Sequence, residues 1–272
     1  MTTGPSRRQV VAAGAGLALA LAAAPAAAAS PRGHHGMRTL YIAGDSTAAQ
    51  KYADAAPETG WGMALPFFLH QDVAVANHAI NGRSTKSFLD EGRLDAILER
   101  IRPGDLLLIQ FGHNDQKITD PTRYTEPWTG YQDNLRRYIA GARERGAVPV
   151  LATSVERRKF DANGTALRTL GEYPASMREV AREEGLALLD VQELSLALWQ
   201  KLGPETTKAY FNWTPTEQDN THFNPPGAIA VARLVAAELL HTRVLAPSDT
   251  RRLDDEIPTR WITWPASEEN RA

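Results

Sequence analysis

Short apolar runs alternate with segments of helical length along most of this chain. The strand-like runs cover residues 39–43, 73–78, 106–111, 148–153 and 187–189. The helix-like segments cover residues 61–69, 93–101, 130–145, 174–184, 191–202 and 225–241. This alternation favours a parallel sheet with helices packed on both faces. We therefore expect an α/β protein with a five-stranded parallel sheet in a three-layer α/β/α arrangement.

No internal linker or repeat divides the body of the chain. Hydrophobic residues make up 43% of the 272 residues, which is enough to fill the core of one large domain. We expect that domain to cover residues 37–245. Residues 246–272 then form an irregular C-terminal tail, whose Trp261 and Trp264 are expected to pack back onto the domain.

Residues 1–29 have the pattern of a secretory signal peptide. The paired Arg7 and Arg8 precede an uncharged stretch over residues 10–24 and a small-residue cleavage region. Paired arginines here are typical of twin-arginine export, so we expect a protein secreted by a bacterium. About 20 apolar residues could also span a bilayer as an uncleaved anchor, but alanine and glycine dominate this stretch. We expect cleavage, no stable membrane association afterwards, and a short tether at residues 30–36.

Two features of the composition exclude whole classes of function. The chain has no cysteine, which excludes disulfides, thiol nucleophiles and thiolate metal sites. Its formal net charge is −2, and loss of the two arginines of the signal would make it −4. No basic cluster is available to neutralise phosphates, so we expect no nucleic-acid partner. We also expect no metal and no cofactor, and the sequence leaves the oligomeric state open.

Polar residues follow the first three strand-like runs at the point where each run ends. Ser46 follows the first run within Gly-Asp-Ser-Thr, Gly82 follows the second, and Asn114 follows the third within Gly-His-Asn-Asp. In open α/β sheets, ligands bind outside the carboxyl ends of the strands. We therefore expect these three residues to meet at one rim of the sheet.

Ser46, Asp219 and His222 could together form a nucleophilic centre. A serine hydroxyl is a poor nucleophile at neutral pH unless an imidazole takes its proton, and a carboxylate must fix the tautomer of that imidazole. Of the seven histidines, only His222 combines a carboxylate three residues earlier with a polar loop around it. As alternatives, Ser46 could cap a helix, and Asp190 could orient His222.

A tetrahedral intermediate on Ser46 would need hydrogen-bond donors for its negative oxygen. The candidates at the predicted rim are the backbone amides of Ser46 and Gly82 and the side-chain amide of Asn114. As alternatives, Gly82 could simply supply a positive φ, and Asn114 could be a turn residue. We expect Asp115 to organise the loop rather than to react.

Four blocks of the sequence resemble, in order and approximate spacing, the conserved blocks of the SGNH, or GDSL-type, hydrolases. They are Gly44-Asp45-Ser46, Gly82, Gly112-His113-Asn114-Asp115 and Asp219-Asn220-Thr221-His222. The blocks Asn81-Gly82-Arg83-Ser84 and Thr221-His222-Phe223 look more narrowly like the rhamnogalacturonan acetylesterase branch. The similarity spans roughly residues 39–240. One departure is the lack of the cysteines that form disulfides in fungal members of that branch.

The resemblance implies a flavodoxin-like strand order, which the alternation of elements does not itself give. It also implies Ser46 as nucleophile, His222 as base, Asp219 as the residue that orients the base, and Ser46, Gly82 and Asn114 as oxyanion donors. The implied activity is deacetylation of plant cell-wall polysaccharide through an acetyl-serine intermediate, with acetylated rhamnogalacturonan as the first candidate. Acetylated xylan, a lipid or a small acyl ester is an alternative substrate. A carbohydrate-binding protein that keeps the fold without catalysis is the alternative from another class.

Basic residues near the predicted site bear on the choice of substrate. A pectic backbone carries uronate charges, which an acidic protein would repel unless the rim of its site is locally basic. Four cations stand close in sequence to the predicted site residues: Arg83, Lys86, Lys117 and Arg123. We expect Arg83 and at least one of the others to contact uronate, with Trp128 or Tyr124 packing on a sugar ring. Each cation could instead be a solvated surface charge.

Overall fold

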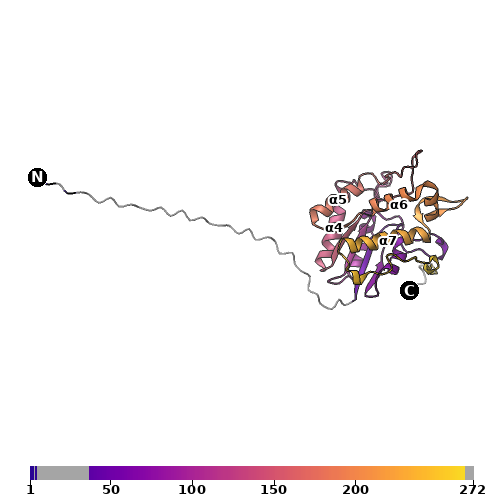
Figure 1. The fold of residues 1–272 in the computed structure, drawn as a ribbon, viewed down its shortest axis with the longest axis horizontal. Coiled ribbons are helices and arrows are strands. Elements are labelled where there is room, and N and C mark those ends of the chain that lie inside the picture. Colours follow the sequence, from indigo (N-terminus) through magenta and orange to yellow (C-terminus); the bar gives the residue numbers. More distant parts are fainter. Residues whose placement is uncertain (3, 5–36, 267–272) are drawn as a thin grey trace. The chain divides into compact units, whose positions relative to one another are not determined.

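The computed structural model describes residues 1, 2, 4 and 37–266 (Figure 1). The chain divides into two units, Met1–His34 and His35–Ala272, and every helix and strand given below belongs to the second. The expected signal peptide and tether, residues 1–29 and 30–36, lie outside the described residues except at positions 1, 2 and 4.

A five-stranded parallel sheet forms the centre of the second unit. Its strands are β1 Arg38–Gly44, β2 Val73–Asn77, β3 Leu106–Gln110, β4 Val148–Ala152 and β5 Leu188–Leu189. Their order in the sheet is β2-β1-β3-β4-β5, and every neighbouring pair is parallel. This confirms both the predicted five strands and the flavodoxin-like order that the family resemblance implies.

Helices cover both faces of the sheet. One face carries α1 Trp61–Ala64, α6 Val191–Thr206 and α7 Pro225–His241. The other face carries α2 Thr85–Asp90, α3 Arg93–Leu98, α4 Gly130–Glu144 and α5 Tyr173–Glu184 (Figure 1). Alternate side chains of β3 feed the two cores, because successive residues of a strand point to opposite faces. The three-layer arrangement is therefore as predicted.

Two of the predicted helices differ from the observed ones for identifiable reasons, and a third, predicted at 93–101, ends three residues early as α3. The segment predicted at 61–69 becomes α1 followed by a 3₁₀ turn at Leu65–Phe68, with Pro66 in its first turn. Helix α6 runs beyond the predicted end at residue 202, with a kink at Gly203, whose φ is 74°. Helix α2 was not predicted. It is short, and its start depends on a capping box between Ser84 and Ser87.

A two-stranded antiparallel hairpin stands where the sequence indicated a polar loop. It pairs β6 Phe211–Trp213 with β7 Gln218–Phe223, and β7 carries both Asp219 and His222. Phe211 and Phe223 are each 1% exposed and pack against Trp199 of α6. Asn224 then caps α7 and donates to the carbonyls of Ala209 and Phe211. Tertiary packing on α6 thus holds a polar segment in strand form.

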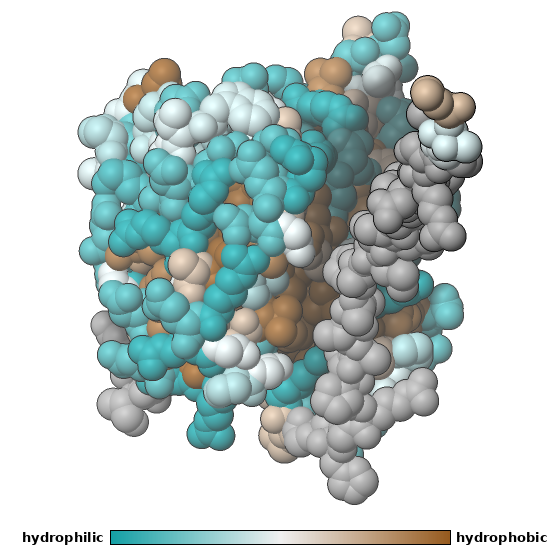
Figure 2. Space-filling model, turned by 90° about the vertical axis from the view of Figure 1, so that its left-hand side faces the viewer, coloured by the Kyte–Doolittle hydropathy of each residue, from teal (hydrophilic) through white to brown (hydrophobic). Residues whose placement is uncertain are grey.

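The C-terminal tail contacts the domain through both of its tryptophans. The Trp264 indole donates to the carbonyl of Glu58 at 2.8 Å, and the Trp261 ring lies edge-on to Phe67 with centroids 5.7 Å apart. The remaining short helices are 3₁₀ turns at Ala53–Ala55, Thr207–Tyr210, Pro247–Asp249 and Thr259–Trp261. Among the described residues, no helix has both the length and the hydrophobicity to cross a membrane. The face shown in Figure 2 is mainly hydrophilic, with hydrophobic residues visible in recesses between polar ones.

Candidate active site

A cleft of about 380 Å³ opens at the carboxyl edge of the sheet. Its lining residues come from loops that follow β1, β2, β3 and β4 and from the β6–β7 hairpin. They are Ser46, Glu58, Asn81, Gly82, His113, Asn114, Lys117, Arg157, Thr221 and His222. The structure therefore brings Ser46, Gly82 and Asn114 to one rim, as ligand sites of open α/β sheets require.

Ser46 lies in a tight turn directly after β1. The buried Asp45 shapes this turn, because its carboxylate accepts from the Thr47 amide at 2.9 Å and from the Thr47 hydroxyl at 2.7 Å. No helix starts at Ser46, so the alternative of a helix-capping serine is wrong. Its Oγ instead lies 2.9 Å from Nε2 of His222.

His222 lies between Ser46 and a carboxylate. Its Nδ1 is 2.6 Å from Oδ2 of Asp219, while Oδ1 of Asp219 accepts from the backbone amides of Thr221 at 2.6 Å and His222 at 3.0 Å. The aspartate is therefore fixed by its own turn. A carboxylate on Nδ1 leaves the Nε2 lone pair facing Ser46, which is the tautomer that a general base needs.

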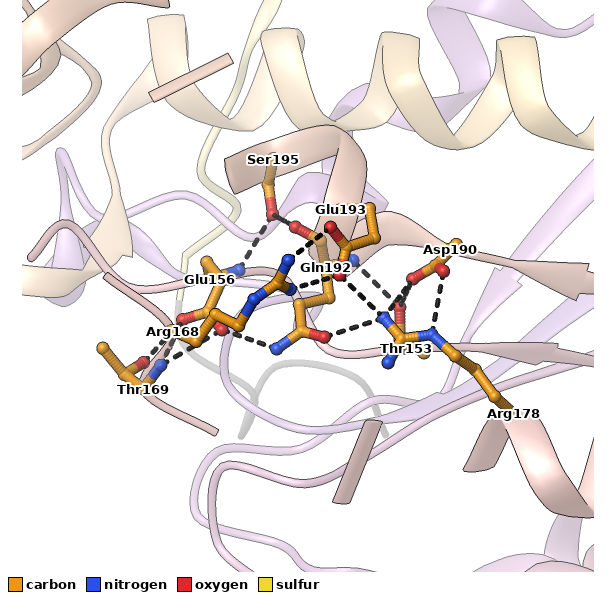
Figure 3. Close-up of polar contacts among 9 residues, drawn as sticks. All are labelled: Thr153, Glu156, Arg168, Thr169, Arg178, Asp190, Gln192, Glu193 and Ser195. Carbon is orange, nitrogen blue, oxygen red and sulfur yellow. Dashed lines mark hydrogen bonds and ion pairs between the residues drawn. The ribbon is translucent and has the colours of Figure 1, made fainter. Parts of the chain in front are cut away.

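Asp190, the alternative carboxylate, lies in a different network (Figure 3). Arg178 donates to both of its oxygens at 2.9 Å, and the Thr153 hydroxyl donates to Oδ1 at 3.0 Å. These contacts occupy Asp190 at the end of β5. Of the two candidate aspartates, the structure brings only Asp219 to His222.

The pKa values of His222 and Asp219 are shifted in opposite directions, and each shift favours the charged form of its group. Burial favours the neutral ring, but the hydrogen bond and charge of Asp219 outweigh it and raise the pKa of His222 above its ordinary value. Burial likewise opposes the charge on Asp219, yet the His222 ring and the backbone donors hold the pKa of Asp219 below its ordinary value. Each group thus stabilises the charged form of the other.

The predicted oxyanion donors lie around Ser46. Gly82 has a φ of 76°, a left-handed conformation that a side chain would strain. Within residues 37–266, no protein group accepts from the backbone amide of Ser46 or Gly82. Asn114 is 4% exposed, and Nδ2 donates one hydrogen to the carbonyl of Arg83 at 3.0 Å, which orients the amide and leaves its second hydrogen available.

Asp115 holds the loop together beneath these donors. Its Oδ1 accepts from the Thr85 amide at 3.0 Å, from the Thr85 hydroxyl and from the Thr125 hydroxyl at 3.0 Å. Complete burial raises the pKa of Asp115 to about 7 against these donors. Its side chain does not line the cleft. Asp115 thus ties the start of α2 to the loop after β3, as expected of an organising residue.

A family model matches this chain. It is described as the GDSL-like lipase/acylhydrolase family and covers residues 42–228, a range that includes the serine, the aspartate and the histidine of the cleft. The chain belongs to this family. Comparison with individual proteins shows how similar the chain is to known sequences and solved structures.

Two relatives come from Bacillus subtilis. The probable rhamnogalacturonan acetylesterase YesY is 46% identical over 197 residues, which cover 72% of this chain and 90% of the relative. The rhamnogalacturonan acetylesterase RhgT is 45% identical over 206 residues, which cover 72% and 87%. Among solved structures, YxiM of the same bacterium is 32% identical with a TM-score of 0.68, covering 76% of this chain and 57% of YxiM.

A more distant structure shares the fold of this GDSL-like family member. It is a variant of the acetyl-xylooligosaccharide esterase Axe2 of Geobacillus stearothermophilus, at 17% identity and a TM-score of 0.54. The match covers 79% of this chain and 98% of Axe2. At this identity the likeness concerns the arrangement of the sheet and helices alone.

Two residues that support this GDSL-like site, Lys51 and Glu58, could not be identified from the sequence. Lys51 is 1% exposed, and Nζ lies 2.5 Å from Oε1 of Glu58 and 2.6 Å from Oδ1 of Asn81. Burial lowers the pKa of Lys51, and Glu58 opposes that shift. The ammonium therefore anchors Asn81, the residue before Gly82, to a carboxylate in the cleft. The contact of Lys51 with Asn81 joins segments thirty residues apart, so no local pattern could have indicated it.

His113, which lines the cleft, forms a second histidine–aspartate pair with the buried Asp45. Nδ1 of His113 lies 3.2 Å from Oδ2 of Asp45. Burial raises the cost of charge on Asp45, yet His113 and Thr47 hold its pKa below the ordinary value. Nε2 of His113 is buried and has no partner within the described part of the chain. Among those same residues, no cluster of three or more His, Cys, Asp or Glu could hold a metal ion.

The residues predicted to bind substrate lie mostly outside this cleft. Arg83 and Lys86 line an adjoining groove of about 840 Å³, where Arg83 pairs with Glu91 and Lys86 pairs with Asp90. Trp128 is 42% exposed and lines neither the cleft nor the groove. Their role in substrate binding stays a prediction. Of the four cations considered, only Lys117 lines the cleft itself.

Proposed function

We propose that this chain is a serine esterase that removes acetyl groups from acetylated plant cell-wall polysaccharide, with acetylated rhamnogalacturonan as its substrate. The observation that carries the proposal is the hydrogen-bonded series from Ser46 through His222 to Asp219, at 2.9 and 2.6 Å. Two relatives at 45–46% identity bear the name rhamnogalacturonan acetylesterase. Their names support an acetylated sugar as the substrate.

In the acylation half-reaction, Ser46 Oγ attacks the acetyl carbonyl while Nε2 of His222 takes the hydroxyl proton. The carbonyl oxygen becomes negative and is stabilised by the amides of Ser46, Gly82 and Asn114. The bond from carbon to the sugar oxygen then breaks, and His222 returns its proton to that oxygen. The products are a free sugar hydroxyl and acetyl-Ser46.

In the deacylation half-reaction, water takes the place of the sugar. His222 removes a proton from this water as it attacks the acetyl carbonyl, and the same donors bind the second oxyanion. The intermediate collapses with return of the proton to Ser46 Oγ. Acetate leaves, and the free serine is restored without any change of oxidation state.

Acetate release from a panel of polysaccharides tests the substrate assignment. We expect acetylated rhamnogalacturonan to be deacetylated with a higher kcat/KM than acetylated xylan or acetylated mannan. A higher kcat/KM on acetylated xylan would instead make acetylated xylan the substrate. Turnover of p-nitrophenyl acetate that is lost with a serine-directed inhibitor separates an esterase from a carbohydrate-binding protein, which would show no turnover.

We also propose that residues 1–29 direct export through the twin-arginine route. Expressed at full length in a bacterium with that translocase, the protein should reach the medium with its first residue near Ser30. Replacement of both Arg7 and Arg8 by lysine should keep it inside the cell. Full-length protein retained in the membrane would favour an uncleaved anchor.

A further inference from the structure

Three cations beside the site are already paired with carboxylates. The pairs are Arg83–Glu91, Lys86–Asp90 and Arg123–Asp120. All six side chains line the adjoining groove, which therefore presents as many carboxylates as cations. A surface with this balance has little net attraction for a polyanion. Cations without a paired carboxylate would attract a uronate more strongly than this groove does.

The cleft next to Ser46 has two cations of a different kind. Lys117 lies in the loop after β3, and Arg157 lies in the extended segment after β4. Both line the cleft with Ser46 and His222. Across residues 37–266, neither side chain has a carboxylate within ion-pair distance. The carboxylate of Glu58, which shares the lining, is paired with Lys51.

Neutral groups hold Arg157 in place. Its Nη1 donates to the carbonyl and hydroxyl of Thr169 at 3.3 and 3.2 Å. In the orientation that satisfies both the oxygen and the nitrogen of the Gln116 side-chain amide, the amide oxygen accepts from Nη2 and Nη1 of Arg157 at 2.7 and 2.8 Å. The guanidinium is therefore fixed in position while its charge stays unpaired.

Burial lowers the pKa of Arg157 and the charge of the neighbouring Glu156 opposes that shift, but the hydrogen bonds of the Glu156 carboxylate go to other groups. Glu156 is 1% exposed and accepts from the amide and hydroxyl of Thr169 at 2.9 and 2.7 Å and from Nε2 of Gln192 at 2.7 Å (Figure 3). The next residue, Arg158, bonds to Asn220 of the hairpin instead. Of these adjacent charged residues, only Arg157 lines the cleft.

Two further observations favour a ligand of opposite charge in the cleft. Burial lowers the pKa of Lys117, and repulsion from Arg123 and Arg157 lowers it further, while the charges of Asp120 and Asp45 oppose the shift. His113, which is 4% exposed, presents a buried Nε2 without a partner within the described part of the chain, and it lines the same cleft. An anionic, hydroxylated ligand would offset the repulsion and could bond to the open nitrogen.

We propose that Lys117 and Arg157 form a carboxylate-binding subsite that holds the uronate of the substrate while its acetyl ester lies at Ser46. This inference rests on the proposed function and assigns the choice of an acidic sugar to two residues of the cleft. Arg157 is fixed in advance by Thr169 and Gln116, so little side-chain entropy is lost on binding. Lys117, which is exposed, supplies the second charge.

A pair of substrates that differ only in charge tests the subsite. They are acetylated rhamnogalacturonan oligosaccharides and the same oligosaccharides after methyl esterification of their uronates. For the wild type we expect a higher kcat/KM on the charged form. Arg157→Gln and Lys117→Gln should each lower the charged-to-esterified ratio by about tenfold or more, because hydrogen bonds to charged groups are lost. Arg157→Lys should keep part of the ratio.

Arg145→Gln is the matched control, because it removes the same charge from the exposed end of α4, away from the cleft. Its ratio should equal that of the wild type. An unchanged ratio in both Arg157→Gln and Lys117→Gln would overturn the subsite. Equal losses on both substrates would also overturn it, since the cations would then act on the reacting ester. If Arg157→Gln fails to fold, Lys117→Gln still tests the subsite, because Lys117 is an exposed side chain whose replacement should leave the fold intact.

A second measurement separates failure of the subsite from failure of the proposed function. D-galacturonate should inhibit turnover of p-nitrophenyl acetate competitively and more strongly than neutral methyl galactoside, and Arg157→Gln should abolish that difference. If the wild type deacetylates neither oligosaccharide but shows this difference, the substrate proposal fails and the subsite stands. If galacturonate and the galactoside inhibit equally, the subsite is wrong whatever the polysaccharide.

Discussion

His222 lies between the Ser46 hydroxyl and the Asp219 carboxylate, and this position determines the pH dependence of activity. Catalysis needs the neutral ring, so kcat/KM should fall on the acid side. Because Asp219 raises the pKa of His222, the midpoint should lie above the ordinary value of about 6.5. Asp219→Asn should move the midpoint to lower pH and reduce kcat by about 10⁴-fold. A midpoint that stays in place in Asp219→Asn would show that another group controls the profile.

Asn114 is expected to act on the transition state rather than on the bound substrate. Removal of one oxyanion donor costs about 10²- to 10³-fold in kcat, so Asn114→Ala should lower kcat far more than it raises KM. Steady-state kinetics on p-nitrophenyl acetate measure both constants. Since Asn114 also bonds to the Arg83 carbonyl, the melting temperature should be recorded in parallel. A change confined to KM would leave Asn114 only its role in the turn.

Residues of the site were predictable where their pattern is local. Asp219 and His222 stand three positions apart, and Ser46 and Asn114 each follow a strand within a short polar block. Lys51 and Arg157 were not predictable in the same way. Their contacts to Asn81 and Thr169 depend on how distant loops fold together, and an isolated Lys or Arg in a sequence most often lies in solvent.

The β6–β7 hairpin is held in position by Arg158 from the segment after β4. The backbone amide of Arg158 donates to the Asn220 carbonyl at 2.8 Å, and Nη1 donates to Asn220 Oδ1 at 2.9 Å. The guanidinium also lies over the Trp213 ring at 4.4 Å. One side chain thus contacts both strands of the hairpin that carries Asp219 and His222.

Arg158→Ala should therefore loosen the hairpin and lower kcat by about tenfold or more, because small displacements of catalytic groups are costly. Lys208→Ala is a matched control. Lys208 also lies over the Trp213 ring, at 5.3 Å, but its ammonium pairs with Glu205. The control should keep nearly full activity on p-nitrophenyl acetate. If Arg158→Ala is as active as Lys208→Ala, the proposed positioning role is wrong.

Helices and strands were predictable from the sequence where the hydrophobic periodicity and the length of a segment indicated the same kind of element. The five strands and helices α4, α5 and α7 match the expected segments to within a residue or two. The hairpin could not be seen in the same way, because β7 is mostly polar and half-exposed. Its strand form comes from packing of Phe211 and Phe223 on Trp199, and tertiary context of this kind overrides local propensity.

At the scale of the whole molecule, the parallel sheet follows from the alternation of strands and helices, whereas the order of strands does not. Periodicity shows that a segment is a strand, and many orders satisfy the same pattern. The flavodoxin-like order was available only through the family resemblance. It is also the feature that matters for the site, because it places β1 between β2 and β3 and so brings Ser46, Gly82 and Asn114 together.

Stability of the whole domain should depend on pH through Asp115. Its pKa in the folded state is about 7, against an ordinary value of 3.8. A raised pKa means that the protonated form stabilises the fold, fully below pH ~4, and that this contribution is lost as the pH rises towards 7. The free energy of unfolding of Asp115→Asn should therefore fall less between pH 4 and 7 than that of the wild type. Denaturant titrations measure it, and parallel curves would show that Asp115 titrates normally.

The proposed mechanism requires that Ser46 carries the acetyl group during turnover. The most direct measurement is acetate release from acetylated rhamnogalacturonan by the wild type and by Ser46→Ala, with folding compared by circular dichroism. The side chain is partly exposed, and within residues 37–266 it bonds only to His222, so a methyl group in its place should leave the fold intact. We predict that Ser46→Ala releases acetate no faster than the uncatalysed background. Near-normal release by a folded, pure Ser46→Ala preparation would contradict the account.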